Sequence, residues 1–169
     1  TIFLDEVSEM SLSLQGRLLR VLAEHSVFRL GDDAVIPVNV RIISATNREI
    51  ENEVNAGRFR RDLYFRLNVL RLDVPPLRSR GKDIITLAKF FLEHYDRKLG
   101  MQGHHFNHDC YPYLLSYGFS GNVRELENMC ERLSVVMDRS EICPHNLESL
   151  FGKELSGPQE DASEKKRIM

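Results

Sequence analysis

Thr1-Ile2-Phe3-Leu4-Asp5-Glu6, the first six residues, form the stretch that decides the fold. The apolar run, with β-branched and aromatic members, predicts a short strand covered on both faces. Two carboxylates follow where the strand is expected to leave its sheet, which is where open α/β sheets bind ligands. One carboxylate there can hold a hydrated Mg²⁺, and its neighbour can orient a water molecule. The alternative is that Asp5 and Glu6 only begin the turn into the next helix.

Length and composition set the broad class. The 169 residues are 42% hydrophobic and 28% charged, which suits one substantial soluble domain or two small ones. The formal net charge of −2 argues against a surface built entirely for nucleic acid. Because no apolar run is long enough for a bilayer and no signal peptide occurs, we expect a cytoplasmic protein without membrane contact. A core strand at the first residue suggests that the sequence starts partway through a domain.

Cysteines and histidines are the candidate metal ligands, namely Cys110, Cys130, Cys143 and the cluster His104, His105, His108. The cysteines lack the paired spacing of a zinc site, so we expect them to be buried and reduced. Two of the histidines have the four-residue spacing of a helical metal site, but the flanking Gly103 and Asn107 favour a loop that leads into a helix.

Strands and helices are predicted to alternate as far as Pro75-Pro76. Ser11 is expected to cap a helix ending near Glu24, with an apolar face formed by Leu14, Leu18, Val21 and Leu22 and with Gln15 pointing elsewhere. The expected elements that follow are a hairpin over 27–36 with a polar tip at 31–33, a strand over 38–47, helices over 48–56 and 58–68, and a strand at Leu70, Leu72 and Val74. Gly57 is expected to close the first of these two helices.

The strand over 38–47 turns fully apolar and then ends in Thr46 and Asn47. Two consecutive strands are therefore predicted to deliver acidic or small polar groups to one edge of the same sheet. Beyond Pro76 the chain is predicted to be purely helical, over 83–99, 109–117, 122–137 and 144–151. From Gly152 the composition is that of a linker, and the last six residues are typical of the start of another helix.

The segment GRFRRDLYFRLNV, residues 57–69, carries four arginines on one expected helix. Arg60 and Arg66 are six residues apart, so they are expected to project roughly 120° from one another. One can then serve an external partner while the other serves its own domain. The alternative for Arg66 is an ordinary helical ion pair with Asp62.

The segment SGNVRELEN, residues 120–128, begins a helix. Asn122 and Glu125 have the spacing of a capping box, which places Arg124 in the first turn. The helix dipole disfavours a cation there unless an anion binds at the same end. The alternative is a surface pair of Arg124 with Glu127 or Asn128.

Five motifs in this order resemble one family. TIFLDE resembles a Walker B strand, ISATNR a sensor I strand end, and GRFRRDLYFRLNV an arginine-finger helix. LDVPPLRSRGKDI resembles the junction to a helical lid, and GNVRELEN a sensor II helix. Together, over residues 1–137, they are similar to the AAA+ ATPase domain of bacterial enhancer-binding activators of the sigma-54 polymerase.

The resemblance implies a fold and a division into domains. The fold class is α/β, the C-terminal part of a P-loop AAA+ core from the Walker B strand onward, followed by an all-α lid. The expected parts are residues 1–76, 77–151 and 152–169, the last being a linker and the start of a truncated helix.

The resemblance also implies roles in ATP hydrolysis. Asp5 would hold Mg²⁺ through water, and Glu6 would polarise the attacking water. Asn47, with Thr46, would sense the γ-phosphate, and Arg124 would contact phosphates from the lid. Arg60 and Arg66 match the finger positions, which reach the neighbouring subunit's nucleotide in a hexameric or heptameric ring. The hairpin near residues 29–35 resembles a pore-facing loop.

Implied cofactors and partners are ATP, Mg²⁺, the sigma-54 RNA polymerase holoenzyme and other copies of the parent chain. Enhancer DNA would bind through a helix-turn-helix that this sequence does not contain. The sequence also lacks the family's Gly-rich phosphate loop and its sigma-gripping loop, which precede the Walker B strand. Phe119-Ser120 replaces the usual Trp-Pro, and Arg61 replaces a common acidic residue.

Without the phosphate-loop strand, which lies between the Asn47 strand and the Leu70–Val74 strand in the family, we expect unpaired edges and exposed apolar surface. The alternative function is a non-enzymatic regulatory or interaction fragment, inactive because it lacks the phosphate loop.

Overall fold

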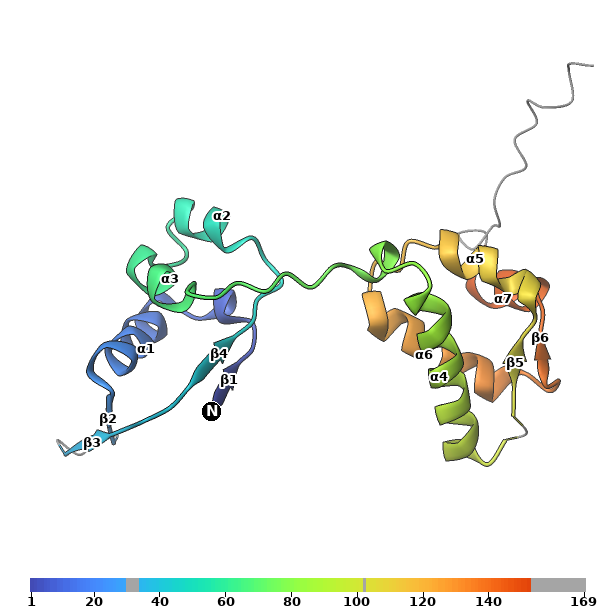
Figure 1. Cartoon of the computed structure of the whole chain (residues 1–169), viewed down its shortest axis with the longest axis horizontal. Coiled ribbons are helices and arrows are strands. Elements are labelled where there is room, and N and C mark those ends of the chain that lie inside the picture. Colours follow the sequence, from blue (N-terminus) through green and yellow to red (C-terminus); the bar gives the residue numbers. More distant parts are fainter. Residues whose placement is uncertain (30–33, 102, 153–169) are drawn as a thin grey trace, which may run out of the picture. The chain divides into compact units, whose positions relative to one another are not determined.

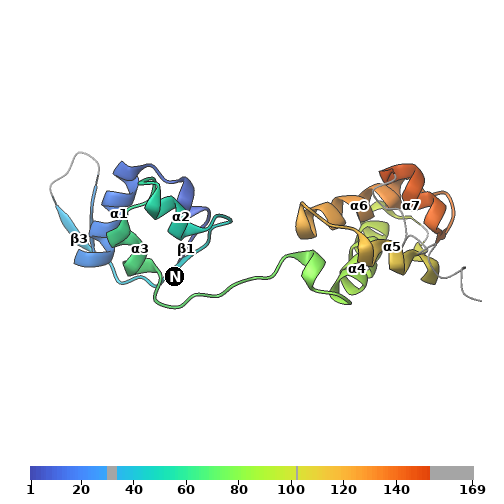
Figure 2. The same ribbon diagram turned by 90° about the horizontal axis from the view of Figure 1, so that it is seen from above.

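The computed structural model describes residues 1–29, 34–101 and 103–152, and the chain divides into two compact units, Thr1–Asp73 and Val74–Met169 (Figure 1). The first unit contains, in order, β1 (Ile2–Leu4), the 3-10 turn η1 (Val7–Glu9), α1 (Leu12–Glu24), β2 (Ser26–Phe28), β3 (Val35–Pro37), β4 (Ile42–Ser44), α2 (Ile50–Asn55) and α3 (Arg61–Leu67). Helices α1 and α3 lie side by side, as both views show (Figure 1, Figure 2).

Strands β1 and β4 form a parallel two-stranded sheet with Ile2 opposite Ile42 and Leu4 opposite Ser44. Both predicted strands are present, although β4 covers only Ile42–Ser44 of the predicted 38–47. Burial on both faces of β1 is wrong, because Ile2 is 44% and Phe3 60% exposed. Within the described residues each of these strands has one neighbour only, so its other edge and much of its apolar surface stay open. The expected unpaired edges and exposed apolar surface are therefore confirmed.

The predicted strand at Leu70, Leu72 and Val74 is wrong. These side chains are 91%, 84% and 75% exposed, and the segment pairs with no strand in the described part of the chain. An alternating pattern becomes a strand only when a neighbouring backbone accepts and donates its hydrogen bonds. Here the segment is held by Arg71, whose guanidinium lies 2.8 Å from both Glu51 and Asp73.

The bounds of the first helix and the pairing of the hairpin follow their predictions, but Leu14, predicted on the apolar face of the helix, is 47% exposed. The Ser11 hydroxyl accepts a hydrogen bond from the Leu14 amide, and α1 ends at Glu24, as expected. Strands β2 and β3 pair antiparallel with Val27 opposite Ile36. The expected polar tip, residues 31–33, lies outside the described residues.

Helix α3 begins at Arg61, three residues later than predicted. The amides of Arg58 and Phe59 both donate to the carbonyl of Glu53, which closes a turn after α2. Gly57 has φ +71°, so it takes the left-handed conformation expected of a residue that ends a helix. Arg60 is extended, with φ −72° and ψ 131°, and flanks the helix instead of belonging to it.

The second unit contains η2 (Leu77–Ser79), α4 (Asp83–Leu99), β5 (His105–Phe106), η3 (His108–Cys110), α5 (Tyr111–Ser116), α6 (Asn122–Val136), β6 (Glu141–Ile142) and α7 (Pro144–Phe151). The predicted helices are confirmed, although the second splits into η3 and α5. The purely helical prediction is wrong in one detail, since β5 and β6 form a short parallel pair. No helix in the described residues has both the length and the apolar content needed to cross a membrane.

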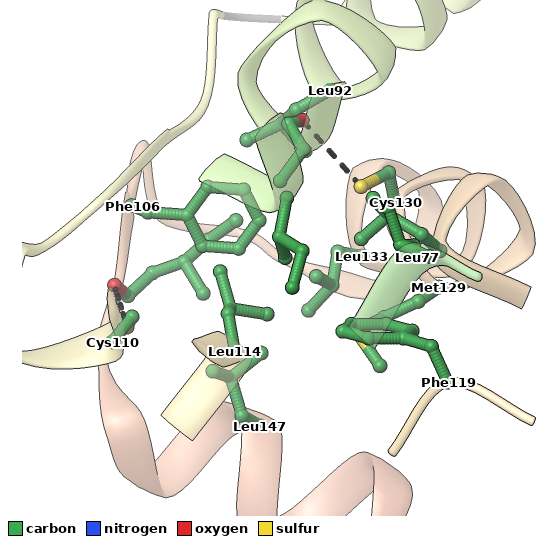
Figure 3. Close-up of a cluster of buried hydrophobic side chains, with 14 residues drawn as sticks. Leu77, Leu92, Phe106, Cys110, Leu114, Phe119, Met129, Cys130, Leu133 and Leu147 are labelled. Carbon is green, nitrogen blue, oxygen red and sulfur yellow. Dashed lines mark hydrogen bonds between the residues drawn. The ribbon is translucent and has the colours of Figure 1, made fainter. Parts of the chain in front are cut away.

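Helices α4 and α6 pack against each other, and an apolar core joins them to the other elements of this unit (Figure 3). Cys110 and Cys130 lie in this core, and their thiols donate to the carbonyls of Ile142 and Ala88. Burial raises the pKa of both thiols to about 12, so they stay protonated. The cysteines are free, as expected, although Cys143 is only half-buried.

His104 takes part in a buried polar network. Its Nδ1 lies 2.7 Å from Asp96 Oδ1, and its Nε2 lies 3.0 Å from the Met137 carbonyl. The Ser134 hydroxyl and the His104 amide also donate to Asp96. In the described residues no group of His, Cys, Asp and Glu side chains is arranged to hold a metal ion. The predicted helix start is confirmed by η3, whose first turn Asn107 caps, but His105 and Phe106 form β5 where a loop was predicted.

Asp96→Asn is expected to lower the free energy of unfolding of the second unit by roughly 3 kcal/mol at pH 7, because it breaks a buried charged network. Burial alone would raise the pKa of Asp96, but hydrogen bonds from Ser134 and His104 outweigh it and lower the pKa below that of an ordinary aspartate. The stabilisation is therefore complete above the unfolded-state pKa and disappears as pH falls through the lower folded-state pKa.

Urea unfolding, followed by amide resonances of the second unit at several pH values, measures this difference. Asp138→Asn is the control, because Asp138 is exposed and makes no ion pair with a described residue. Equal stability of the Asp96→Asn and Asp138→Asn variants at pH 7 would contradict the role given to the network.

Candidate active site

The carboxyl ends of β1 and β4 meet at one edge of the first unit. The Ala45 amide donates to the Leu4 carbonyl at 2.8 Å, and the Val7 amide donates to the Ala45 carbonyl at 3.0 Å. This parallel ladder continues past both strands, so Asp5-Glu6 and Thr46-Asn47 emerge at the same edge. The prediction that two consecutive strands deliver polar groups to one edge is confirmed.

Asp5 and Glu6 are both exposed at this edge. The Glu6 amide donates to Asp5 Oδ1 at 3.0 Å, which fixes one carboxylate oxygen and leaves the other open to a ligand. Glu6 has φ +49°, an uncommon conformation for a residue with a side chain. Its carboxylate forms no ion pair with the described residues. Two adjacent, solvated carboxylates suit a hydrated divalent cation and an activated water.

Thr46 and Asn47 differ in the hydrogen bonds that their side chains make. The Thr46 hydroxyl donates to the buried Ser8 hydroxyl at 2.8 Å and accepts from the Arg48 amide at 3.1 Å. Thr46 therefore braces the end of β4 against the turn that follows β1. Asn47 is exposed, and its side-chain amide has no hydrogen-bond partner among residues 1–29, 34–101 and 103–152. Of the two, Asn47 is the group available to a ligand.

Arg60 and Arg66 are not related as predicted. Because Arg60 precedes α3 in an extended conformation, the 120° separation on one helix is wrong. The Arg60 guanidinium instead binds both oxygens of Asp62, at 3.0 and 2.7 Å. These bonds are the main reason that the pKa of Asp62 is lowered. Arg66 donates to the Leu22 carbonyl at 3.1 Å, so its alternative, an ion pair with Asp62, is also wrong.

Arg60 lies between two hollows on the surface of the first unit. One, of about 490 Å³, is also lined by Arg61, Asp62 and Phe65. The other, of about 420 Å³, is lined by residues of α1 that include Gly16, Arg17 and Arg20. The guanidinium is therefore accessible from outside while Asp62 holds it.

Gln15 is the residue that sequence reasoning missed. The prediction that it points away from the core is wrong, since it is completely buried. Its amide nitrogen donates to the carbonyls of Met10 and Arg58, and its oxygen accepts from the Arg60 amide. The available signal was its spacing, because Gln15, Leu18, Leu19 and Leu22 follow the i, i+3, i+4, i+7 pattern of one helical face.

The start of α6 differs from the predicted capping box. Asn122 has φ +55°, and its side-chain oxygen accepts from the Leu77 amide at 2.9 Å, so it cannot cap its own helix. Glu125 instead accepts from the Gly121 amide and the Tyr117 hydroxyl. The capping box does not form because Asn122 is the first residue of the helix, and its side-chain oxygen is bound to the Leu77 amide of η2 instead.

Arg124 is exposed in the first turn of α6, which belongs to the second unit. Its alternative partner Glu127 accepts instead from Tyr95, and no ion pair joins Arg124 to a carboxylate in the described residues. The surface-pair alternative is therefore wrong for Glu127, and no hydrogen bond with Asn128 is present there either. A solvated guanidinium beside helix amides is chemically suited to an anion.

Comparison with known proteins gives matches along most of the chain. A family model described as the sigma-54 interaction domain matches residues 1–73, and one described as the AAA+ ATPase lid domain matches residues 78–164. The DNA-binding transcriptional regulator NtrC of Proteus hauseri is 46% identical over 149 residues, which are 88% of this chain and 32% of that protein. The anaerobic nitric oxide reductase transcription regulator NorR of Citrobacter koseri is 49% identical over 83% of this chain and 28% of its own length.

Solved structures of a related regulator also match most of this chain. NtrX from Brucella abortus in complex with ADP superimposes with a TM-score of 0.76 at 35% identity, over 82% of this chain and 32% of that one. The same protein in complex with ATP gives 0.76 at 36% identity, over 79% and 31%. The chain thus spans about a third of the length of the proteins it matches.

Thr46→Val is expected to destabilise the first unit by about 1–2 kcal/mol, because it leaves the buried Ser8 hydroxyl without this partner. Urea unfolding followed by amide resonances of the first unit measures the change. Ser13→Ala serves as the control, because Ser13 is exposed and makes no side-chain hydrogen bond within the described residues. A Thr46→Val variant as stable as the control contradicts the bracing role.

Proposed function

This chain belongs to the AAA+ family of sigma-54-dependent transcriptional activators, and on that premise we propose that it is the water-activating and lid part of an ATP-hydrolysing activator. The observation that supports this most directly is the common edge at which Asp5, Glu6 and Asn47 emerge. Two solvated carboxylates and a free amide at the ends of neighbouring parallel strands suit a Mg²⁺-bound triphosphate and its attacking water.

We assign each group at the edge one role. Asp5, whose second carboxylate oxygen is open, would hold Mg²⁺ through a water, and Glu6 accepts the proton of the attacking water. Asn47 donates to the γ-phosphate, with Thr46 holding the strand end in position. Bound Mg²⁺ supplies charge neutralisation at the phosphate oxygens.

Arg60 and Arg66 act from a neighbouring subunit in a ring. Arg60 is exposed between two hollows, so a nucleotide on another subunit can reach it, and Asp62 supplies a temporary partner until then. Arg66 contacts α1 through the Leu22 carbonyl, which leaves part of its guanidinium for a second partner. Arg124 contacts nucleotide phosphates from the lid, in line with its solvated position at a helix start.

The partners proposed for the whole protein follow from its family. It assembles into a hexameric or heptameric ring in the bacterial cytoplasm, remodels sigma-54 RNA polymerase holoenzyme at promoters and binds enhancer DNA through a C-terminal helix-turn-helix. NtrC and NorR are named as transcription regulators, and NtrX is described with ADP and with ATP, which supports nucleotide binding here.

Glu6→Gln in the full-length protein is expected to lower the ATP turnover number at least about 100-fold, because it removes the group that accepts the proton of water. ATP affinity is expected to stay within a small factor of wild type, since the amide keeps the size of the side chain. Phosphate release and fluorescent-nucleotide binding measure the two quantities. Wild-type turnover in this variant would reject the role of Glu6.

Mixtures of two inactive variants test whether Arg60 acts between subunits. Glu6→Gln and Arg60→Ala are each expected to be inactive alone, and a 1:1 mixture is expected to regain activity at about a quarter of its sites. Those sites combine Glu6 of one subunit with Arg60 of the other. Arg66→Ala is tested in the same way, and failure of both pairs contradicts action in trans.

A second candidate function, which applies to the 169 residues by themselves, is that of a non-enzymatic regulatory or interaction fragment. They contain no Gly-rich loop ending in Lys-Ser or Lys-Thr to hold phosphates. We therefore expect the isolated chain to release no phosphate from ATP in the presence of Mg²⁺. The Glu6→Gln variant of the same chain gives the background, and release above that background contradicts this expectation.

A further inference from the structure

Gln15 uses its whole side-chain amide inside the first unit. Nε2 donates to the Met10 carbonyl at 2.8 Å and to the Arg58 carbonyl at 3.0 Å, and Oε1 accepts from the Arg60 amide at 2.8 Å. Both amide protons and the oxygen are thus engaged. Because the residue is fully buried, water cannot replace any of these bonds.

The bonds to Arg58 and Arg60 hold the chain on both sides of Phe59, which is 2% exposed. The buried Phe59 and the bonds of Gln15 to Arg58 and Arg60 together fix the position of the Arg60 backbone. Asp62 then orients the guanidinium, and its Oδ1 is itself held by the Leu63 amide at 2.8 Å. Arg60 is therefore fixed at its backbone by Gln15 and at its tip by Asp62, although its side chain is exposed.

The bond to Met10 connects this arrangement with the edge that carries Asp5 and Glu6. The Met10 amide donates to the Val7 carbonyl, and the Val7 amide donates to the Ala45 carbonyl beyond β4. A continuous set of hydrogen bonds therefore runs from the ends of β1 and β4 through Gln15 to the backbone of Arg60.

We propose that Gln15 is the positioning residue for Arg60, setting the backbone from which this arginine reaches the nucleotide of a neighbouring subunit. The inference rests on the proposed function of Arg60 and adds a residue to it. Gln15 touches neither nucleotide nor water, and acts only through the arginine. An error of about 1 Å in such a group can lower a rate 100-fold.

The test uses the full-length protein with Gln15→Met, which keeps the length of the side chain and removes all three hydrogen bonds. The turnover number is expected to fall at least about tenfold while the KM for ATP changes little, because an arginine finger acts in the transition state. Leu18→Ala, which truncates a half-buried apolar residue of α1, is the control for simple destabilisation and is expected to keep near wild-type turnover at a temperature where both variants are folded.

Subunit mixing separates positioning of Arg60 from damage to the nucleotide site of the same subunit. Gln15→Met mixed with Glu6→Gln is expected to regain activity, since the first supplies Glu6 and the second supplies a well-placed Arg60. A Gln15→Met subunit that cannot bind fluorescent ATP is replaced by Gln15→Glu, which keeps an acceptor for the Arg60 amide.

The outcomes distinguish the positioning role of Gln15 from the proposed role of Arg60. Recovery on mixing, with a lowered turnover number alone, supports the positioning role. Unchanged turnover of Gln15→Met, or no recovery on mixing, overturns it while the reference pair of Glu6→Gln and Arg60→Ala still complements. If the reference pair itself does not complement, the proposed role of Arg60 fails, and the inference fails with it.

Discussion

The parallel pairing of β1 with β4 is the constraint on which the site depends. Its register, with Leu4 opposite Ser44, makes both strands end at the same edge, and the Val7–Ala45 hydrogen bond extends the pairing beyond them. A shift by one residue would turn each side chain to the other face of the sheet. Asp5, Glu6 and Asn47 can then serve one ligand only because a short run of backbone hydrogen bonds fixes where they emerge.

The two units are stabilised in different ways. In the second, a continuous apolar core joins α4 and α6 to the smaller elements. In the first, the buried apolar side chains among the described residues are Val7, Phe59 and Leu63, and the buried polar ones are Ser8, Gln15 and Glu53. Apolar contacts tolerate small displacements, whereas a saturated hydrogen-bond set such as that of Gln15 specifies one arrangement.

Elements whose signals are local could be predicted from the sequence. The Ser11 cap, the hairpin and the long helices α4 and α6 follow from capping residues and periodicity, and the shared edge of β1 and β4 follows from how parallel strands end. The strand at Leu70 could not be excluded, because alternation does not report whether a partner strand is present. The helical spacing of Gln15 indicates the face on which it lies, but its partners Arg58 and Arg60 are 43 and 45 residues away. The Asn122 bond to Leu77 likewise joins segments 45 residues apart, so no local pattern contains these bonds.

We propose that Asp5, Glu6 and Asn47 form the water-activating side of an ATP site. The most direct measurement is an experimental structure of the full-length Glu6→Gln protein with ATP and Mg²⁺. We expect a Mg²⁺-bound water on the Asp5 carboxylate, the Asn47 amide on the γ-phosphate, and Arg60 of the adjacent subunit turned from Asp62 toward the nucleotide. ATP bound elsewhere, with this edge still facing solvent, would contradict it.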